Sequence, residues 1–230
     1  MNRFFATSQI NENYFELDKE TLKHLAVIRI EQKPFIINYL EKFYLCRLEN
    51  NLAKIIEPLD INNELGYEVI LAASIIKIER YEWLIQKAIE LGATKIVPII
   101  SKHTDGSIYK HDKFAKKYDR FNTIIKSATE QSFRNKLITL DPIMDYKKAI
   151  YKYKYINNKY IAHEIDLQKT SKLDKIKSDV IFFVGPEGGY DQSEIDYALE
   201  NNYKCIYLGK RILRAETASI YLLSQLDENN

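Results

Sequence analysis

An apolar run followed directly by glycines occupies residues 181–189, Ile-Phe-Phe-Val-Gly-Pro-Glu-Gly-Gly. A second run, Cys205-Ile206-Tyr207, ends at Leu208-Gly209, and four of the seven glycines lie between positions 185 and 209. Short β-branched and aromatic runs are typical of buried strands, and glycine is used where φ is positive or a ligand touches the main chain. Because ligands bind at the carboxyl ends of strands in open α/β sheets, both blocks predict a ligand site there.

An ordinary tight turn between a strand and a helix is the alternative explanation of the Gly-Pro-x-Gly-Gly run. The second block favours a ligand loop, because residues 208–218 add arginine, glutamate and threonine at another strand-to-helix switch. Two such loops in the C-terminal half suggest one pocket.

Alternating strands and helices are expected on both sides of these blocks. We expect strands at residues 69–76, 96–100 and 180–184, near 160–163 and in the run ending at Leu208, and helices over 79–91, along 114–128 and from about Thr217. Asp191 and Glu194 have the spacing of a helix cap pair. This alternation predicts an α/β fold with a mainly parallel sheet.

The N-terminal part has a different pattern. Short apolar runs such as Phe35-Ile36-Ile37 and residues 43–48 are separated by polar connectors, which favours short strands. We therefore expect a small β-rich domain at 1–68 and a larger α/β domain at 69–230. A chain of 230 residues with 46% hydrophobic composition is long enough to bury a core without disulfides.

Composition excludes several classes of protein. Cys46 and Cys205 are isolated, so neither a disulfide framework nor a zinc site is indicated, and we expect no metal. The N-terminus lacks the apolar core of a signal peptide, and no stretch approaches eighteen apolar residues, so we expect a soluble, cytoplasmic protein without a membrane partner. The glycine patterns of Rossmann and P-loop nucleotide sites are absent.

Basic residues are concentrated in two segments, although the net charge is only 34 − 32 = +2. Residues 102–136 hold nine Lys or Arg against four acids, and residues 146–160 hold five lysines, no acid and interleaved tyrosines at 146, 151, 153, 155 and 160. Basic surface with aromatic residues can hold phosphates and stack unpaired bases. The alternative is a compositional bias that places solvated lysines on helix faces.

Five motifs in the same order resemble one known family. They are Lys77-x-x-Arg80-x-Glu82, Gln86-Lys87-Ala88-x-Glu90-Leu91-Gly92, Glu130-Gln131-Ser132-x-Arg134, Gly185-Pro186-Glu187-Gly188-Gly189 and Leu208-Gly209-x-Arg211-Ile212-Leu213-Arg214-x-Glu216-Thr217-Ala218. Together they resemble the small-subunit (16S) ribosomal RNA uridine-N3 methyltransferases of the SPOUT superfamily. The N-terminal part is similar only through Arg3-Phe4-Phe5 and His24-Leu25-x-x-Ile28-Arg29.

This resemblance implies a fold, a cofactor and partners. The implied fold is a SPOUT-type sheet with a C-terminal trefoil knot, preceded by a PUA-like RNA-binding barrel. The implied cofactor is S-adenosylmethionine, the implied substrate is 16S ribosomal RNA in the assembled small subunit, and the implied assembly is a homodimer. By resemblance, the cofactor pocket is formed by Gly185, Glu187, Gly188, Leu208, Gly209, Ile212 and Leu213.

Methylation of uridine N3 requires removal of one proton and control of charge on the uracil. Arg214, Glu216 and Glu130 are the catalytic candidates: Arg214 would hold a phosphate or stabilise charge on a uracil oxygen, and either glutamate would accept the proton. The alternative is structural, because a glutamate at a helix start is stabilised by the helix dipole. Gln131, Arg134 and Arg29 are candidates for substrate binding; a hydrogen-bond cluster at a helix end is the alternative for the first two.

Two segments depart from the family pattern. Lys102-His103-Thr104 stands where the family has an Arg-Ser pair, and residues 30–34 lack a Gly-Asp turn. Neither change lies in the sequence of the two C-terminal loops. Three functions therefore remain open: uridine-N3 methylation, ribose 2′-O-methylation by the same fold, and RNA binding without catalysis. An apolar face on the last helix, through Ala218, Ile220, Tyr221, Leu222 and Leu226, would serve dimer pairing or the core.

Overall fold

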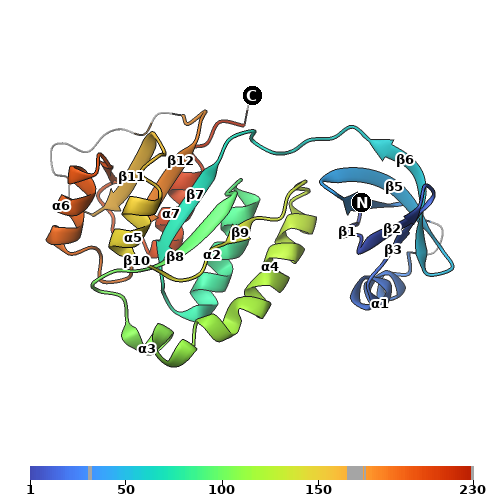
Figure 1. The fold of residues 1–230 in the computed structure, drawn as a ribbon, viewed down its shortest axis with the longest axis horizontal. Coiled ribbons are helices and arrows are strands. Elements are labelled where there is room, and N and C mark those ends of the chain that lie inside the picture. The colour runs from blue at the N-terminus through green and yellow to red at the C-terminus, as the bar shows by residue number, and fades with distance from the viewer. Residues whose placement is uncertain (31–32, 165–172, 174, 229–230) are drawn as a thin grey trace. The chain divides into compact units, whose positions relative to one another are not determined.

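The computed structural model describes residues 1–30, 33–164, 173 and 175–228. Residues 31 and 32 of the segment without a Gly-Asp turn lie outside this part of the chain. The chain forms two compact units (Figure 1): Met1–Glu64 with Thr129–Leu137, and Leu65–Ala128 with Ile138–Asn230. The sequence predicts a boundary between residues 68 and 69, with residues 129–137 in the larger domain. The compact units instead group residues 129–137 with the N-terminal residues. The assignment of two functional domains stays a prediction.

The first unit is built on one six-stranded sheet. Its order is β1-β4-β5-β6-β3-β2, and all pairs are antiparallel except β1 with β4. The strands are β1 (Arg3–Phe5), β2 (Ser8–Asn11), β3 (Tyr14–Glu16), β4 (Phe35–Tyr39), β5 (Lys42–Glu49) and β6 (Leu52–Leu59). Phe15, Phe35 and Ile37 are fully buried in its core.

The first unit also contains a helix that the strand pattern does not predict. Helix α1 (Lys19–Val27) begins after Asp18, whose side chain accepts a hydrogen bond from the backbone N–H of Thr21. An aspartate at this position stabilises a helix start because it satisfies an otherwise unpaired N–H group. Leu25 then packs into the core beneath the sheet.

The second unit is a three-layer α/β/α structure whose strands all pair in parallel (Figure 1). The sheet order is β10-β8-β7-β12-β11-β13, with β9 also paired to β8. The strands are β7 (Val69–Ser74), β8 (Lys95–Ile100), β9 (Thr139–Leu140), β10 (Met144–Asp145), β11 (Asn158–His163), β12 (Val180–Val184) and β13 (Lys204–Tyr207). The predicted α/β fold with a mainly parallel sheet is confirmed.

Helices cover both faces of this sheet. One face packs against α2 (Ile78–Glu90), α4 (Tyr118–Gln131) and α7 (Ala215–Leu223), and the other against α5 (Tyr146–Lys152) and α6 (Gln192–Glu200). The helix α3 (Gly106–Tyr109) and two 3₁₀ segments, Lys110–Asp112 and Ala115–Lys117, precede α4. Since both faces are covered, the strands are continuous apolar runs rather than alternating ones.

The predicted cap pair is confirmed. The Asp191 side chain accepts from the first turn of α6, and Glu194 reaches back to the Asp191 backbone N–H. The interpretation of residues 146–160 as a stacking surface is wrong for two tyrosines. Tyr146 and Tyr153 are buried in the core around α5, whereas Tyr151 and Tyr155 are exposed. These tyrosines belong to or follow the seven-residue helix α5, which the lysine-rich sequence did not predict.

Both cysteines are free and buried, Cys46 in the first unit and Cys205 in the second. Burial raises the pKa of Cys46 to about 12 and that of Cys205 to about 11, so both thiols are protonated at neutral pH. Among the helices of the described ranges, none has the length and hydropathy needed to cross a membrane.

Candidate functional site

A cavity of about 270 Å³ lies in the second unit at the carboxyl ends of β11, β12 and β13. Its walls come from α2, from the strand ends and from the loops that follow β12 and β13. The lining residues are Arg80, Ala162, His163, Glu164, Val184, Gly185, Pro186, Glu187, Gly189, Tyr190, Leu208, Gly209, Arg211, Ile212, Leu213, Arg214, Ala215 and Ala218. The two glycine-containing loops therefore meet at one cavity, as their position after buried strands predicts.

The glycines of the two loops have different constraints. A Cβ on Gly185 would lie 3.2 Å from the Tyr190 ring, so the ring would have to shift by a few tenths of an ångström to admit a larger residue. Gly209 has φ +108°, where L-residues are strained, and a Cβ there would meet no heavy atom within 4 Å. Gly209 therefore leaves open space at the cavity wall that a side chain would fill.

The segment Lys102-His103-Thr104 supports the first loop. The His103 Nδ1–H donates to the Gly188 carbonyl at 3.1 Å, a direction required because a carbonyl only accepts. Lys102 Nζ lies 2.7 Å from Asp191 Oδ2 at the start of α6. Gly188 does not line the cavity; its contact is with His103. Two of the three residues that depart from the family pattern, Lys102 and His103, therefore hold the loop and the following helix in place.

Arg80 on α2 connects the two loops electrostatically. Its Nη1 lies 3.1 Å from Glu187 Oε1 in the first loop, and its Nε lies 3.9 Å from Glu216 Oε1 at the start of α7. The Arg80 side chain is 32% exposed, so part of its guanidinium faces the cavity. One cation thus fixes the spacing between two acidic side chains from separate loops.

The catalytic candidates Arg214 and Glu216 flank the first residue of α7. Arg214 is exposed, lines the cavity and is the N-cap residue of the helix. Glu216 is buried behind the lining residue Ala215, and in the described part of the chain its Oε2 has no hydrogen-bond partner. Ile212 is 83% exposed, which is unusual for a large apolar side chain beside a cavity.

His163 and Glu164 also line the cavity, although the sequence analysis did not select them. The backbone N–H of Glu164 donates to His163 Nδ1, so the neutral ring carries its hydrogen on Nε2. Burial lowers the pKa of His163, and the charge of Glu164 only partly offsets this effect. Its buried Nε2 has no partner among the described residues. The sequence feature that could have indicated these two residues is that they form a polar pair at the end of the strand predicted near 160–163.

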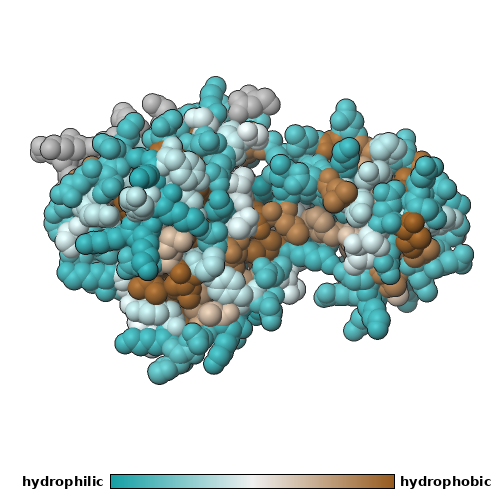
Figure 2. Space-filling model, in the orientation of Figure 1, coloured by the Kyte–Doolittle hydropathy of each residue, from teal (hydrophilic) through white to brown (hydrophobic). Residues whose placement is uncertain are grey.

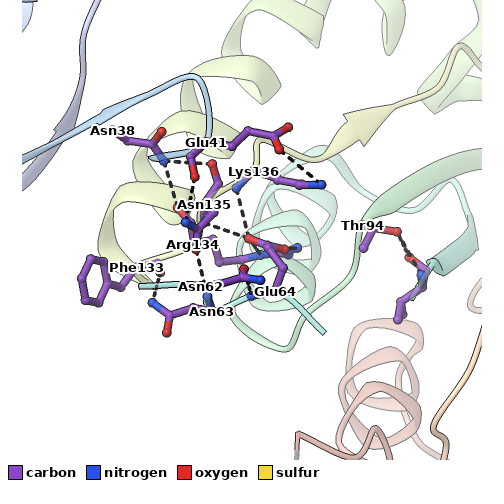
Figure 3. Close-up of polar contacts among 11 residues, drawn as sticks. Asn38, Glu41, Asn62, Asn63, Glu64, Thr94, Phe133, Arg134, Asn135 and Lys136 are labelled. Atoms are coloured by element: carbon purple, nitrogen blue, oxygen red, sulfur yellow. Dashed lines mark hydrogen bonds and ion pairs between the residues drawn. The ribbon is translucent and has the colours of Figure 1, made fainter. Parts of the chain in front are cut away.

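Glu130, Gln131 and Arg134 belong to the first unit and do not line this cavity. Glu130 Oε1 accepts a hydrogen bond from the backbone N–H of Phe5, and the Gln131 carbonyl accepts one from Arg3. Arg134 forms an ion pair with Glu64, with Nη2 2.6 Å from Oε2 (Figure 3). The structure therefore gives all three residues contacts within the first unit.

The Glu64 carboxylate organises this group, which is drawn in Figure 3. Besides Arg134, it accepts from the backbone N–H groups of Asn135 and Lys136 at 2.8 and 3.1 Å. Asn135 Nδ2 donates to the carbonyls of Glu41 and Ile61, both at 2.9 Å. Burial alone would raise the pKa of Glu64, but the hydrogen bonds and the charge of Arg134 outweigh it and hold the pKa below its ordinary value.

Arg29 is exposed and follows α1 with a left-handed backbone, φ 49°. It lies in the first unit, and its backbone N–H donates to the Ala26 carbonyl. The described residues contain no group of three or more His, Cys, Asp or Glu side chains arranged to hold a metal ion.

Comparison with known proteins identifies the family. The model of the RNA methyltransferase domain matches residues 63–227. Ribosomal RNA small subunit methyltransferase E of Mesomycoplasma hyopneumoniae is 37% identical over 227 residues, covering 98% of each chain. This chain belongs to the ribosomal RNA small subunit methyltransferase E family. The methyltransferase E of Bacillus subtilis is 33% identical over 183 residues, which cover 75% of this chain and 70% of that protein.

A solved methyltransferase E from Neisseria gonorrhoeae, bound to S-adenosyl methionine, has a closely similar structure. Its TM-score is 0.84 at 31% identity, and the match covers 97% of this chain and 95% of that chain. The resemblance drawn from the five motifs is therefore confirmed at the level of the family. The roles of the individual site residues stay predictions.

Proposed function

We propose that this protein transfers a methyl group from S-adenosylmethionine to N3 of a uridine in 16S ribosomal RNA of the small ribosomal subunit. The observation that carries the proposal is the single cavity at the sheet edge, lined by both glycine-containing loops. Membership of the methyltransferase E family and the relative bound to S-adenosyl methionine support it.

The cavity has features suited to this cofactor. Open space at Gly209 and the close packing of Gly185 against Tyr190 leave backbone, not side chains, at the cavity wall. Of the expected cofactor residues, Gly185, Glu187, Leu208, Gly209, Ile212 and Leu213 line the cavity, and Gly188 supports the loop through His103. His163 adds a ring N–H that has no partner among the residues described, and Glu164 adds a carboxylate. When bound there, S-adenosylmethionine supplies the methyl group.

The remaining chemistry belongs to the chain. Arg214, exposed at the cavity, stabilises negative charge on a uracil oxygen as the N3 proton leaves. Glu216 is the first candidate to accept that proton: its Oε2 has no partner within the described ranges, and it follows Arg214 and Ala215, which line the cavity. Arg80 holds the other Glu216 oxygen and thereby orients the carboxylate. Glu130 is the second candidate for the proton acceptor; its contact with Phe5 favours a structural role.

The finer features of the family belong to the same proposal. They are a trefoil knot in the C-terminal part, a PUA-like barrel in the first unit, a homodimer, and action in the cytoplasm on the assembled small subunit. Ala218, Leu222 and Leu226 are buried in the core of this chain, so dimer pairing would use exposed neighbours such as Tyr221. Gln131, Arg134 and Arg29 stay candidates for RNA contact from the first unit.

The test uses purified protein, labelled S-adenosylmethionine and small ribosomal subunits from cells that lack the modification. After digestion of the RNA, we expect the label in 3-methyluridine. Label in a 2′-O-methylated nucleoside would retain the fold and overturn the chemistry. Absence of both label and cofactor binding would favour an RNA-binding protein without catalysis.

A further inference from the structure

A second concave surface in the second unit is not used by the proposed chemistry. It is an open groove of about 500 Å³, lined by Lys77, Ile78, Glu79, Ser107, Ile108, Lys113, Lys116 and Lys117. We call it the lysine groove. Its walls come from the start of α2, from α3 and from the 3₁₀ segments before α4. Figure 2 shows hydrophobic as well as hydrophilic side chains in the region around α3.

The lysines of the lysine groove form no close ion pair among the residues described, although Asp105 and Glu82 lie near enough to feel the charges of Lys77, Lys113 and Lys117. The four lysines, Lys77, Lys113, Lys116 and Lys117, are exposed, and none has a carboxylate within 4 Å in the described part of the chain. Glu79 is the only acid among the lining residues described. Five other lysines of this unit form ion pairs: Lys87–Glu90, Lys95–Glu68, Lys102–Asp191, Lys152–Asp141 and Lys177–Asp227.

The potential of these lysines acts on the nearest acid. Asp105 stands just before α3 and its pKa lies below the ordinary value, first because it accepts from Ser107 and then because Lys113 and Lys77 are positively charged. A groove that keeps several ammonium groups together without partners favours a polyanion with regularly spaced charges. Ile78 and Ile108 add apolar floor against which a ribose or base can pack.

The groove and the cavity are joined by one helical turn. Lys77, Ile78 and Glu79 line the groove, and the next residue, Arg80, lines the cavity. Since both surfaces belong to the second unit, their relation does not depend on the first unit. A chain of phosphates lying in the groove would lead along the start of α2 to the place where Arg80 and Arg214 meet the cavity.

We propose that the lysine groove binds the phosphates of the single-stranded RNA that flanks the target nucleotide. This inference rests on the proposed function, because it supplies the path by which an RNA substrate reaches the cavity. The partner is single-stranded RNA rather than duplex, because a base presented to an enclosed cavity must be unstacked.

The test is a salt titration with a short single-stranded RNA as the probe. The variant K77Q/K113Q/K116Q/K117Q is compared with the wild-type full chain by fluorescence anisotropy. Each phosphate contact contributes about 0.7 to the slope of log K against log salt for single strands. The slope should therefore fall in magnitude by about 3, with affinity reduced at least about tenfold near 100 mM salt. The KM for small subunits should rise while S-adenosylmethionine affinity stays unchanged.

The matched control removes the same charge elsewhere in the unit. The variant K147Q/K148Q/K154Q/K204Q changes four exposed lysines that do not line the groove. An unchanged slope in the groove variant, or an equal loss in the control, would overturn the proposal. Thermal melting of both variants checks that they fold, and K113Q/K116Q provides a milder variant. A wild-type chain that binds RNA through the groove but methylates nothing would refute the proposed function alone.

Discussion

Two arginines, one in each unit, are paired with carboxylates in opposite ways. Arg134 in the first unit is 6% exposed and lies 2.6 Å from Glu64, which is itself 9% exposed. Arg80 in the second unit is 32% exposed and lies 3.1 and 3.9 Å from two glutamates of separate loops. The Arg134–Glu64 pair is buried, and its hydrogen bonds stabilise the fold; we call it the closed pair. In the second group Arg80 and Glu187 are partly exposed at the cavity, while the Glu216 side chain is 9% exposed and its Oε2 has no hydrogen-bond partner among the described residues.

This difference distinguishes residues that only match a functional motif in the sequence from residues that lie at the cavity, where they can contact a ligand. Glu130-Gln131-Ser132-x-Arg134 and Arg214-x-Glu216 are equally prominent in the sequence. In the structure, the first motif contributes to a buried polar group of the first unit, whereas Arg214 of the second motif lines the cavity and Glu216 is buried next to it in the chain. Unpaired polar groups beside a cavity are the stronger indication of a ligand, because burial without a partner costs free energy.

The largest expected effect comes from opening the closed pair. Glu64→Ala should lower the free energy of unfolding of the first unit by about 3–5 kcal/mol, because the buried Arg134 loses the carboxylate that lies 2.6 Å from its Nη2. Urea denaturation followed by Phe and Tyr fluorescence measures this loss. The affinity for S-adenosylmethionine should stay within a factor of two of wild type.

Glu41→Gln is the matched control for that loss. The Lys136–Glu41 pair joins the same segments but is more than half exposed, so its removal should cost less than about 1 kcal/mol. Equal destabilisation by both variants would contradict the contrast between closed and exposed pairs.

The next effect concerns the group formed by Arg80, Glu187 and Glu216. Glu216→Gln should slow single-turnover methylation about 100-fold with little change in stability, because the amide cannot accept the N3 proton. Glu130→Gln should change the rate less than about threefold. Quenched single-turnover assays with saturating cofactor give both numbers. If Glu130→Gln slows methylation more than Glu216→Gln, Glu130 is the proton acceptor. If Glu216→Gln weakens cofactor binding, the role of Glu216 is to hold Arg80 in place.

A smaller effect is expected at the cavity wall. Gly209→Val should weaken S-adenosylmethionine binding about tenfold, because a residue other than glycine is strained by about 1–3 kcal/mol at such a φ and its side chain fills the open space. Isothermal titration calorimetry measures the change. Gly66→Val is the control, because Gly66 also has positive φ and open surroundings but does not line the cavity. Normal cofactor affinity in the Gly209 variant would argue against this loop as a binding surface.

The smallest effect is a pH dependence of the first unit. Because the pKa of Glu64 is lowered in the folded state, its contribution to stability is present above the unfolded carboxyl pKa of about 4.3. That contribution is lost as the pH falls through the lower folded value. Chemical denaturation between pH 6 and pH 3 should show a steeper decline for wild type than for Glu64→Gln. Parallel curves would show that Glu64 does not contribute to acid sensitivity.

Local pattern was sufficient for most of the fold. The buried run at residues 180–184 and the pair Asp191/Glu194 coincide with β12 and the capping box of α6, because both depend on nearest neighbours in sequence. Helix α1 was missed because its polar composition conceals a single core face around Leu25. Helix α5 was missed because its lysines suggested a surface, although Tyr146 is buried.

The candidate site was predictable only in part. Both loops of the cavity follow from glycines after buried strands. The link from Arg80 to Glu187 and Glu216 does not, since it joins residues more than a hundred positions apart and depends on tertiary packing. The same is true of His163, whose unpaired Nε2 is visible only in the folded chain. For Arg134 the sequence shows a cation but not that Glu64 already neutralises it.

The position of Arg80 has a thermodynamic consequence. It touches both loops of the cavity, and the residues just before it border the lysine groove. Any ligand that displaces the first turn of α2 therefore changes the spacing of the two loops at once. If RNA in the groove displaces this turn, linkage requires that it change the affinity for S-adenosylmethionine by the same factor by which S-adenosylmethionine changes the affinity for RNA. Through the Arg80 guanidinium, each of the two substrates would then change the binding affinity of the other.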